Sequence, residues 1–277
     1  MSKDSFFPVC GFIGLGSQGA PIANRMIAAG LPTVLWARRN QTLKPFRNTG
    51  ASFCENIADL GRQADHVGIC VVGDDGVTEV CGELLPAMRA GSRVAIHSTI
   101  LPATCQELAD QAQQHGVHLI DAAVSGGKPA ADTGTLTLML GGDPEIIDLM
   151  RPVLSTFSSL MIHLGDVGAG QQAKLINNSL MVANMGLAHR AVTSGVELGL
   201  DREALLQLLQ SSSAGSFALD VYAKRADIQS FDRAETLFEK VHLLGEILGK
   251  GHPTFRVLLD AANSLRQPRD DQGRRDE

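Results

Sequence analysis

Aromatic side chains are scarce in this chain: they make up 4% of its 277 residues, with one tryptophan and one tyrosine. A platform of rings on which bases stack is therefore not expected. Lys and Arg number 24 against 30 for Asp and Glu, a formal net charge of −6, and no basic run lies in the interior. Both facts argue against nucleic acid as a partner. No run approaches the about 18 apolar residues that a membrane-spanning helix needs, so no membrane contact is expected.

Cysteines are few, and none are spaced as CxxC: Cys10, Cys54, Cys70, Cys81 and Cys105. Most lie in apolar stretches, which is typical of buried thiols in a reducing compartment rather than of disulfides or zinc ligands. The eight histidines form no HxH or HExxH pattern, so no metal site is predicted. No cleavage-site pattern follows the apolar patch near the N-terminus, so a soluble, cytoplasmic protein is expected.

The hydrophobic fraction of 44% excludes a disordered chain, and the length suits one large or two ordinary domains. As far as residue 165, short apolar runs alternate with helical patterns. Strands are expected at Pro8–Ile13, Thr33–Ala37, His66–Val72, Arg93–His97, Val117–Val124, Leu136–Leu140 and Leu160–Leu164, and helices at Ala20–Ala29, Val77–Met88, Ala103–His115 and Pro144–Leu154. This alternation predicts βαβ units in a mostly parallel sheet.

The pattern changes at a glycine-dense joint over residues 165–170. One long helix with many small residues is predicted from Gln171 to Leu198. Further helices are expected at Asp201–Gln210, Ser216–Arg225, Ala234–Leu248 and Pro253–Leu265. We therefore predict an α/β domain over residues 1–165 and an all-helical substrate and dimerisation domain over 166–277, with residues 266–277 as a disordered tail. The long helix has more apolar surface than a thin helical domain covers, which predicts a homodimer or higher homo-oligomer.

A glycine-rich segment joins the first predicted strand to the first predicted helix. Gly14, Gly16 and Gly19 fit the spacing GxGxxG. In that motif the first glycine permits a tight turn, the second lets the backbone approach a pyrophosphate, and the third lets helix and strand pack closely. The alternative is an ordinary glycine-rich turn, but the flanking strand and helix favour a Rossmann-type dinucleotide site. Its loop also contains Leu15, Ser17 and Gln18.

The second predicted strand ends without the carboxylate that usually holds the ribose 2′-hydroxyl of NAD. Arg38 and Arg39 stand there instead. Since guanidinium groups pair bidentately with phosphate, this predicts that NADP is preferred, with NAD left open as the alternative. An ordinary solvated pair of surface arginines would give the same sequence.

Two further segments contain groups suited to catalysis. Ser125, Gly126 and Gly127 follow a predicted strand, and a turn of this kind binds a carboxylate through its hydroxyl and backbone N–H groups. Lys174 and Asn178 lie four residues apart, on one face of the long helix. An ammonium partly buried near the positive helix end has a lowered pKa, which suits proton transfer. The alternatives are a plain turn and a solvated surface lysine.

Taken together these segments resemble the β-hydroxyacid dehydrogenase family, typified by 3-hydroxyisobutyrate dehydrogenase and including tartronate semialdehyde and glyoxylate/succinic semialdehyde reductases. The motifs occur in the family's order over residues 9–250: GFIGLGSQGAPIANRM, HSTILPAT, DAAVSGGKPAADTGTLTLMLGG, GAGQQAKLINN and, more weakly, FEKVHLLGEI. The resemblance implies an oxidoreductase that transfers hydride between NADP(H) and a small β-hydroxyacid, semialdehyde or 2-oxo acid.

The same resemblance assigns roles to individual residues. It makes Lys174 the catalytic acid/base and gives Asn178 the task of orienting the substrate. Ser125, Gly126 and Gly127 would hold the substrate carboxylate. The implied cofactor contacts are the glycine loop (Gly14, Leu15, Gly16, Ser17, Gln18 and Gly19), Arg38, Arg39, Val72, Thr99 and Lys240.

Some positions depart from the family pattern. Gln18 replaces a usual methionine, His97 a frequent acidic residue, and Val241 the acid after the last lysine, which weakens the alignment of Lys240. Asn177 stands where a phosphogluconate-type decarboxylating enzyme would have histidine. Two alternatives remain: an imine reductase of the same superfamily, in which the lysine is usually replaced, and a non-catalytic NADP-binding protein.

Overall fold

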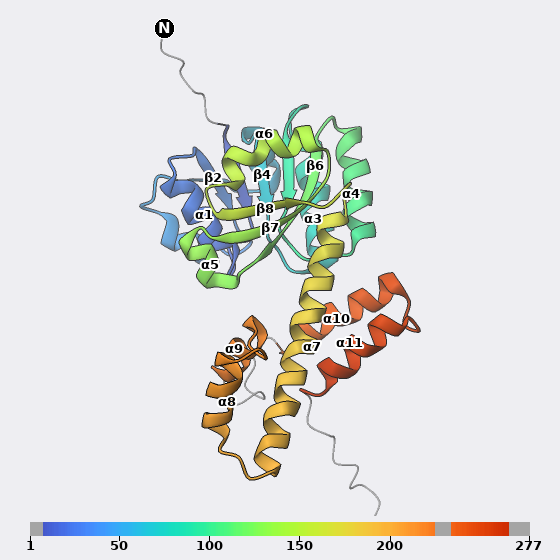
Figure 1. The fold of residues 1–277 in the computed structure, drawn as a ribbon. Coiled ribbons are helices and arrows are strands. Elements are labelled where there is room, and N and C mark those ends of the chain that lie inside the picture. The colour runs from blue at the N-terminus through green and yellow to red at the C-terminus, as the bar shows by residue number, and fades with distance from the viewer. Residues whose placement is uncertain (1–7, 225–233, 266–277) are drawn as a thin grey trace, which may run out of the picture. The chain divides into compact units, whose positions relative to one another are not determined.

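A computed structural model describes residues 8–224 and 234–265 and divides into two compact units, Met1–Lys174 and Leu175–Glu277. Figure 1 shows a layered α/β first unit and a helical second unit. Among the described residues, no helix combines the length and apolar character needed to cross a membrane. The tail predicted to be disordered, residues 266–277, lies outside the described residues.

An eight-stranded sheet forms the centre of the first unit, in the order β3-β2-β1-β4-β5-β6-β7-β8. The strands are β1 (Cys10–Ile13), β2 (Thr33–Trp36), β3 (Ser52–Phe53), β4 (His66–Ile69), β5 (Arg93–Ile96), β6 (His118–Ser125), β7 (Leu136–Gly141) and β8 (Ser158–His163). All neighbours pair in parallel except β6 and β7. The chain leaves β1 for β2 on one side and returns to β4 on the other. Ligands bind doubly wound sheets at such a reversal.

Helices cover both faces of this sheet. The helices of the first face are α1 (Gly19–Ala28), α5 (Gly127–Thr133) and α6 (Pro144–Leu154); those of the second are α2 (Ile57–Gln63), α3 (Gly73–Leu84) and α4 (Pro102–Gln114). Because side chains alternate along a strand, Phe12 is buried in the first core and Ile13 in the second. Two short 3-10 helices, η1 (Asn40–Phe46) and η2 (Leu85–Ala87), complete the unit.

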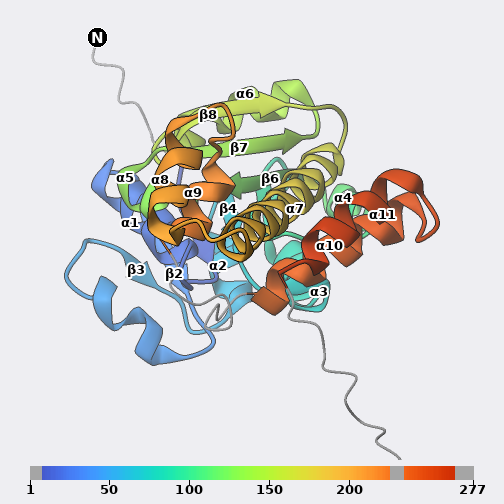
Figure 2. The same cartoon turned by 60° about the horizontal axis from the view of Figure 1, so that its bottom comes forward.

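The second unit consists of helices: most of α7 (Ala169–Glu197), α8 (Arg202–Ser211), α9 (Phe217–Ala223), α10 (Ala234–Leu248) and α11 (Pro253–Asn263). Helices α10 and α11 lie side by side in Figures 1 and 2. A side chain at Gly186 of α7 would collide with the carbonyl oxygen of Ala261, so α7 and α11 pack at backbone distance. Asp201 caps α8 as its sequence indicates, since its side chain accepts a hydrogen bond from the Ala204 N–H at 2.8 Å.

The predicted fold class, a Rossmann-type unit followed by helices, is confirmed. Four elements were not predicted from the sequence: β3, α2, η1 and α5. Helix α5 begins directly at the pair Gly126-Gly127, which have φ of 123° and 66°, so a segment interpreted as a turn is also a helix start. The antiparallel pairing of β7 has a simple cause: ten residues separate it from β6, and a parallel crossover needs a dozen or more.

Candidate active site

The glycine loop after β1 has a geometry that only glycine provides. Gly14 has φ of 98°, and a Cβ there would collide with the carbonyl oxygen of Cys70. A Cβ at Gly19 would collide with the carbonyl oxygen of Gly14, so α1 starts against the end of β1. Gly16 is exposed and a Cβ there would meet nothing within 4 Å. The first and third glycines therefore shape the loop, while the second leaves room for a ligand.

Helix α1 presents an N-terminus suited to an anion. Gln18, its N-cap residue, makes no side-chain capping hydrogen bond, and the first turn contains no acidic residue. The positive end of the helix dipole is therefore not neutralised by the helix itself, which is the arrangement that binds a pyrophosphate.

The two predicted arginines follow β2 and are exposed. The guanidinium of Arg38 is 2.9 Å from a carboxylate oxygen of Glu79 on α3, with side chains 72% and 60% exposed. Such an exposed pair contributes little to stability. Glu79 is a residue that sequence reasoning missed, because the pair joins positions 41 residues apart.

The loops after β4 and β5 are fastened to each other. The hydroxyl of Ser98 accepts a hydrogen bond from the Val71 N–H at 2.9 Å, and Asp74 accepts one from the Leu101 N–H at 2.9 Å. Val72, which precedes α3, is 91% exposed, and Thr99 is half-buried. Both predicted cofactor residues thus lie at the carboxyl-terminal ends of neighbouring parallel strands.

Asp121 of β6 holds the start of α7, and its role was not predicted. Its carboxylate is fully buried and accepts hydrogen bonds from the N–H groups of Gly168 and Gln171, both at 2.7 Å. Burial raises the pKa of Asp121, and these backbone hydrogen bonds oppose the rise. A Cβ at Gly170 would collide with the Met139 carbonyl and contact the Asp121 carboxylate, so the glycines of the joint allow this approach.

Gln171, also missed, connects the same helix to the loop of Thr99. Its buried side-chain amide donates to the Ser98 carbonyl at 2.9 Å and accepts from the Ile100 N–H at 3.1 Å. We call these contacts, together with those of Asp121, the Asp121–Gln171 network. Lys174 follows Gln171 by three residues on α7 and is half-buried. The network therefore fixes the helical turn that precedes Lys174 to β6 and to the loop that follows β5.

The remaining predicted residues occupy three places. Ser125 ends β6 and is half-buried, with Gly126 and Gly127 directly after it. Asn178, one turn beyond Lys174 on α7, is buried at 7% exposure. Lys240 lies on α10 of the second unit and is half-buried. The glycine loop, Arg38, Val72, Thr99 and Ser125 all follow the carboxyl-terminal ends of parallel strands, where ligands of such sheets bind.

His97, which departs from the family pattern, is a core residue here. It is 3% exposed, its ring stacks on Phe12 with centroids 6.0 Å apart, and Nδ1 lies 2.9 Å from the Ala122 carbonyl. Burial lowers its pKa to about 4, so the ring is neutral near pH 7. Among the described residues, no group of three or more metal-binding side chains occurs, and all five cysteines are free thiols.

Comparisons with known proteins identify the family of the chain. Residues 9–165 match the model of the NAD binding domain of 6-phosphogluconate dehydrogenase, and residues 168–237 match that of the NAD-binding region of NADP-dependent 3-hydroxyisobutyrate dehydrogenase. An uncharacterized oxidoreductase of Mycobacterium tuberculosis is 34% identical over 86% of this chain and 83% of its own length. The NAD-dependent L-serine dehydrogenase of Pseudomonas aeruginosa is 34% identical over 76% of this chain and 72% of its own.

Solved structures show the same fold. The M. tuberculosis 3-hydroxyisobutyrate dehydrogenase with L-serine has a TM-score of 0.83 at 23% identity, covering 92% of each chain. An imine reductase of Streptomyces aurantiacus has a TM-score of 0.69 at 19% identity, covering 92% of this chain and 93% of its own.

Fold and site together define a dinucleotide-binding oxidoreductase with a helical second unit. The chain belongs to the 3-hydroxyisobutyrate dehydrogenase-like β-hydroxyacid dehydrogenases, as its motifs predict, and is an NAD(P)-dependent enzyme of that class.

Proposed function

We propose that this enzyme transfers hydride between NADP(H) and a small β-hydroxyacid, semialdehyde or 2-oxo acid, with Lys174 as general acid/base. The observation that carries the proposal is the Asp121–Gln171 network. In this network the buried carboxylate of Asp121 and the buried amide of Gln171 hold the turn before Lys174 against β6 and the loop of Thr99. A protein that only binds a nucleotide has no need to fix a lysine in this way.

The described residues fit a nicotinamide dinucleotide. The exposed backbone at Gly16 and the N-terminus of α1 would hold the pyrophosphate, together with Leu15, Ser17 and Gln18. Val72, Thr99 and, from α10, Lys240 are the other contacts that we assign. When bound, the cofactor supplies or accepts the hydride.

Lys174 would donate a proton from Nζ to the carbonyl oxygen as the substrate is reduced, and accept the hydroxyl proton in the reverse direction. Asn178, one turn further along α7, would orient the reacting oxygen through its side-chain amide. The hydroxyl of Ser125 and the N–H groups of Gly126 and Gly127 would hold the substrate carboxylate. Each role uses a group that lies on or beside β6 or α7.

NADP is the cofactor that we propose as preferred. Arg38 and Arg39 follow β2 with exposed guanidinium groups, and no carboxylate ends the strand itself. The pair with Glu79 is exposed and weak, so Arg38 is able to exchange that partner for a 2′-phosphate.

We further propose a cytoplasmic homodimer, built from a cofactor domain (1–165) and a helical domain (166–277). Four large apolar side chains of α7 are exposed: Ile176, Leu180, Leu187 and Val196. The first three recur at spacings of four and seven, so they share one side of the helix. Exposed apolar surface of this kind is typical of a subunit interface. Light scattering on the purified chain should give twice its mass; a monomer would contradict the proposal.

The decisive experiment compares Lys174→Ala with the wild type on a panel of hydroxyacids, semialdehydes and cyclic imines, with both cofactors. We expect kcat on the best hydroxyacid to fall about 10²- to 10⁴-fold, while NADPH binding stays unchanged. Lys250→Ala removes an exposed lysine of the second unit and serves as the matched control. Faster turnover of imines than of any carbonyl acid would make the enzyme an imine reductase, and no turnover at all would leave a nucleotide-binding protein.

A further inference from the structure

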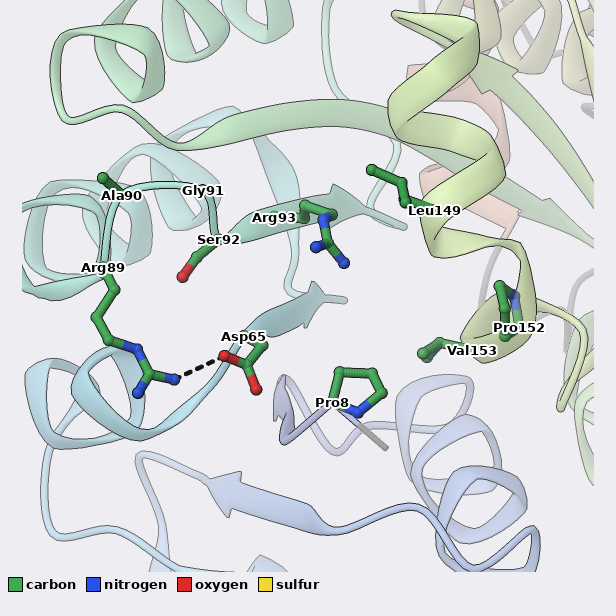
Figure 3. A pocket seen from close by; sticks show the side chains of 10 residues that line it. All are labelled: Pro8, Asp65, Arg89, Ala90, Gly91, Ser92, Arg93, Leu149, Pro152 and Val153. Atoms are coloured by element: carbon green, nitrogen blue, oxygen red, sulfur yellow. Dashed lines mark hydrogen bonds and ion pairs between the residues drawn. The ribbon is translucent and has the colours of Figure 1, made fainter. Parts of the chain in front are cut away.

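A pocket lies at the amino-terminal ends of the parallel strands, away from the loops that form the candidate active site. It has a volume of about 470 Å³ and is shown in Figure 3. Pro8 precedes β1, Asp65 precedes β4, and Ser92 and Arg93 stand at the start of β5. One wall is formed by α6.

The charges that line this pocket leave an excess of one positive charge. Arg89 and Arg93 contribute two positive charges and Asp65 one negative charge. Asp65 is already engaged: one carboxylate oxygen is 2.7 Å from the Arg89 guanidinium, and the other accepts the Val9 N–H at 3.0 Å. Among the described residues that line the pocket, Arg93 is therefore the cation without a counter-charge.

Among the residues that the structure describes, the guanidinium of Arg93 has no hydrogen bond or ion pair, and its Nε is buried. It has two neighbours across the sheet: the exposed His118 on β6, and His66 on β4, which is 1% exposed. Burial, aided by His97 and Arg93, lowers the pKa of His66 to about 3, so this ring provides no charge. The hydroxyl of Ser92, which also lines the pocket, makes no hydrogen bond within the described part of the chain either. The Arg93 side chain as a whole is half-buried, and a buried donor such as its Nε–H is unfavourable without an acceptor, which a ligand can supply.

The opposite wall is apolar. It includes Leu149, which is 57% exposed, and Val153, both on α6. In Figure 3 the side chain of Arg93 points into the space between β5 and this helix.

We propose that this pocket binds a small organic carboxylate with a short apolar tail. The carboxylate pairs with the Arg93 guanidinium and accepts a hydrogen bond from the Ser92 hydroxyl, and the tail lies on Leu149 and Val153. A planar guanidinium matches a carboxylate bidentately, and one excess positive charge suits a monoanion. The site is independent of the proposed reaction, since none of its residues belongs to the candidate active site.

The test titrates the full-length enzyme with butyrate while the Arg Nε–H signals and the Leu and Val methyl signals are followed by NMR. The Arg93 Nε–H, Leu149 and Val153 signals should shift along one saturable curve in the millimolar range. Butyramide, which has the same shape without the charge, should not produce it. Arg93→Met keeps an apolar stem and should weaken the binding seen at Leu149 and Val153 at least about tenfold. Arg151→Met removes an exposed arginine of α6, the helix that contains Leu149 and Val153, and is the matched control.

Equal shifts with butyramide, or unchanged binding in Arg93→Met, would overturn the proposal. Tighter binding of inorganic phosphate than of butyrate at the same signals would overturn the assigned ligand class. Should Arg93→Met fail to fold, Ser92→Ala and the wild-type titration still decide the question. Lys174→Ala should leave the titration unchanged, so this proposal and the proposed reaction fail independently.

Discussion

The two ends of the parallel strands differ in how a charged side chain is paired. At the carboxyl-terminal end, the buried carboxylate of Asp121 has backbone donors on both oxygens. At the amino-terminal end, the guanidinium of Arg93 has no partner among the described residues. A buried charge whose hydrogen bonds are satisfied fixes neighbouring elements, whereas an unpaired donor is a place where a ligand can bind. In this sheet the carboxylate of Asp121 fixes the start of α7, and the guanidinium of Arg93 is the group that we propose recognises a ligand.

Removal of the satisfied charge should have the largest effect on stability. Asp121→Ala leaves the N–H groups of Gly168 and Gln171 without their acceptor, and each buried unsatisfied donor costs about 1–3 kcal/mol. We therefore expect a loss of about 2–6 kcal/mol in the free energy of unfolding, measured with urea. Asp132→Ala removes an exposed carboxylate that pairs with Lys128 and should cost less than about 1 kcal/mol. Equal losses in the two variants would show that the Asp121–Gln171 network does not hold α7.

A second prediction concerns two buried, neutral histidines, His66 at the start of β4 and His97 directly after β5. An unfolded chain protonates His97 near pH 6.5, but the folded protein does so only near its lowered pKa of about 4. Over that interval the unfolded state binds the extra proton, so stability falls as the pH falls, by about 3 kcal/mol for this group. His66, with a pKa lowered to about 3, adds a loss in the same direction.

The variant His97→Asn tests this directly. Its side-chain amide still reaches toward the Ala122 carbonyl but does not titrate. The free energy of unfolding, measured with urea between pH 7 and pH 4, should therefore depend less steeply on pH, by about one proton. His118→Asn, at an exposed position on β6, is the control and should keep the wild-type slope. An unchanged slope in His97→Asn would mean that the buried ring is protonated with the native structure intact.

Local patterns predicted the repeating parts of this molecule. Alternating apolar runs gave the major strands, and the glycine spacing gave the loop whose outer members, Gly14 and Gly19, have no room for a Cβ. Helix α2, only seven residues long, and the two-residue β3 have too little periodicity to be detected this way. Helix α5 was missed because glycine and proline at its start are equally typical of a turn.

The candidate site was predictable only where function depends on adjacent residues. Asp121 and Gln171 stand inside motifs that the sequence singles out, yet their partnership joins positions 50 residues apart. No periodicity encodes such a contact. Arg93 is the converse case: it begins a strand as many arginines do, and its distinction is that no carboxylate of the described residues pairs with it. Whether an arginine has a carboxylate partner is visible only in the folded structure.

The smallest predicted effect concerns Arg38, the exposed and paired counterpart of Arg93. If its guanidinium binds the 2′-phosphate, Arg38→Ala should lower the ratio of NADPH to NADH affinity about tenfold or more, since hydrogen bonds to charged groups contribute about 1.5–3 kcal/mol. Glu79→Gln should act in the opposite direction, by less than about fivefold, because Arg38 no longer has to leave an ion pair that is worth less than about 1 kcal/mol.

Parallel binding titrations with the two cofactors measure both ratios, and Arg62→Ala, an exposed arginine of α2 that pairs with Asp59, is the control. The Arg62→Ala control separates phosphate recognition from a general effect of surface charge, because a general effect of losing a cation would lower the ratio in Arg62→Ala as well. A ratio near one in the wild type, unaltered by Arg38→Ala, would contradict the preference for NADP.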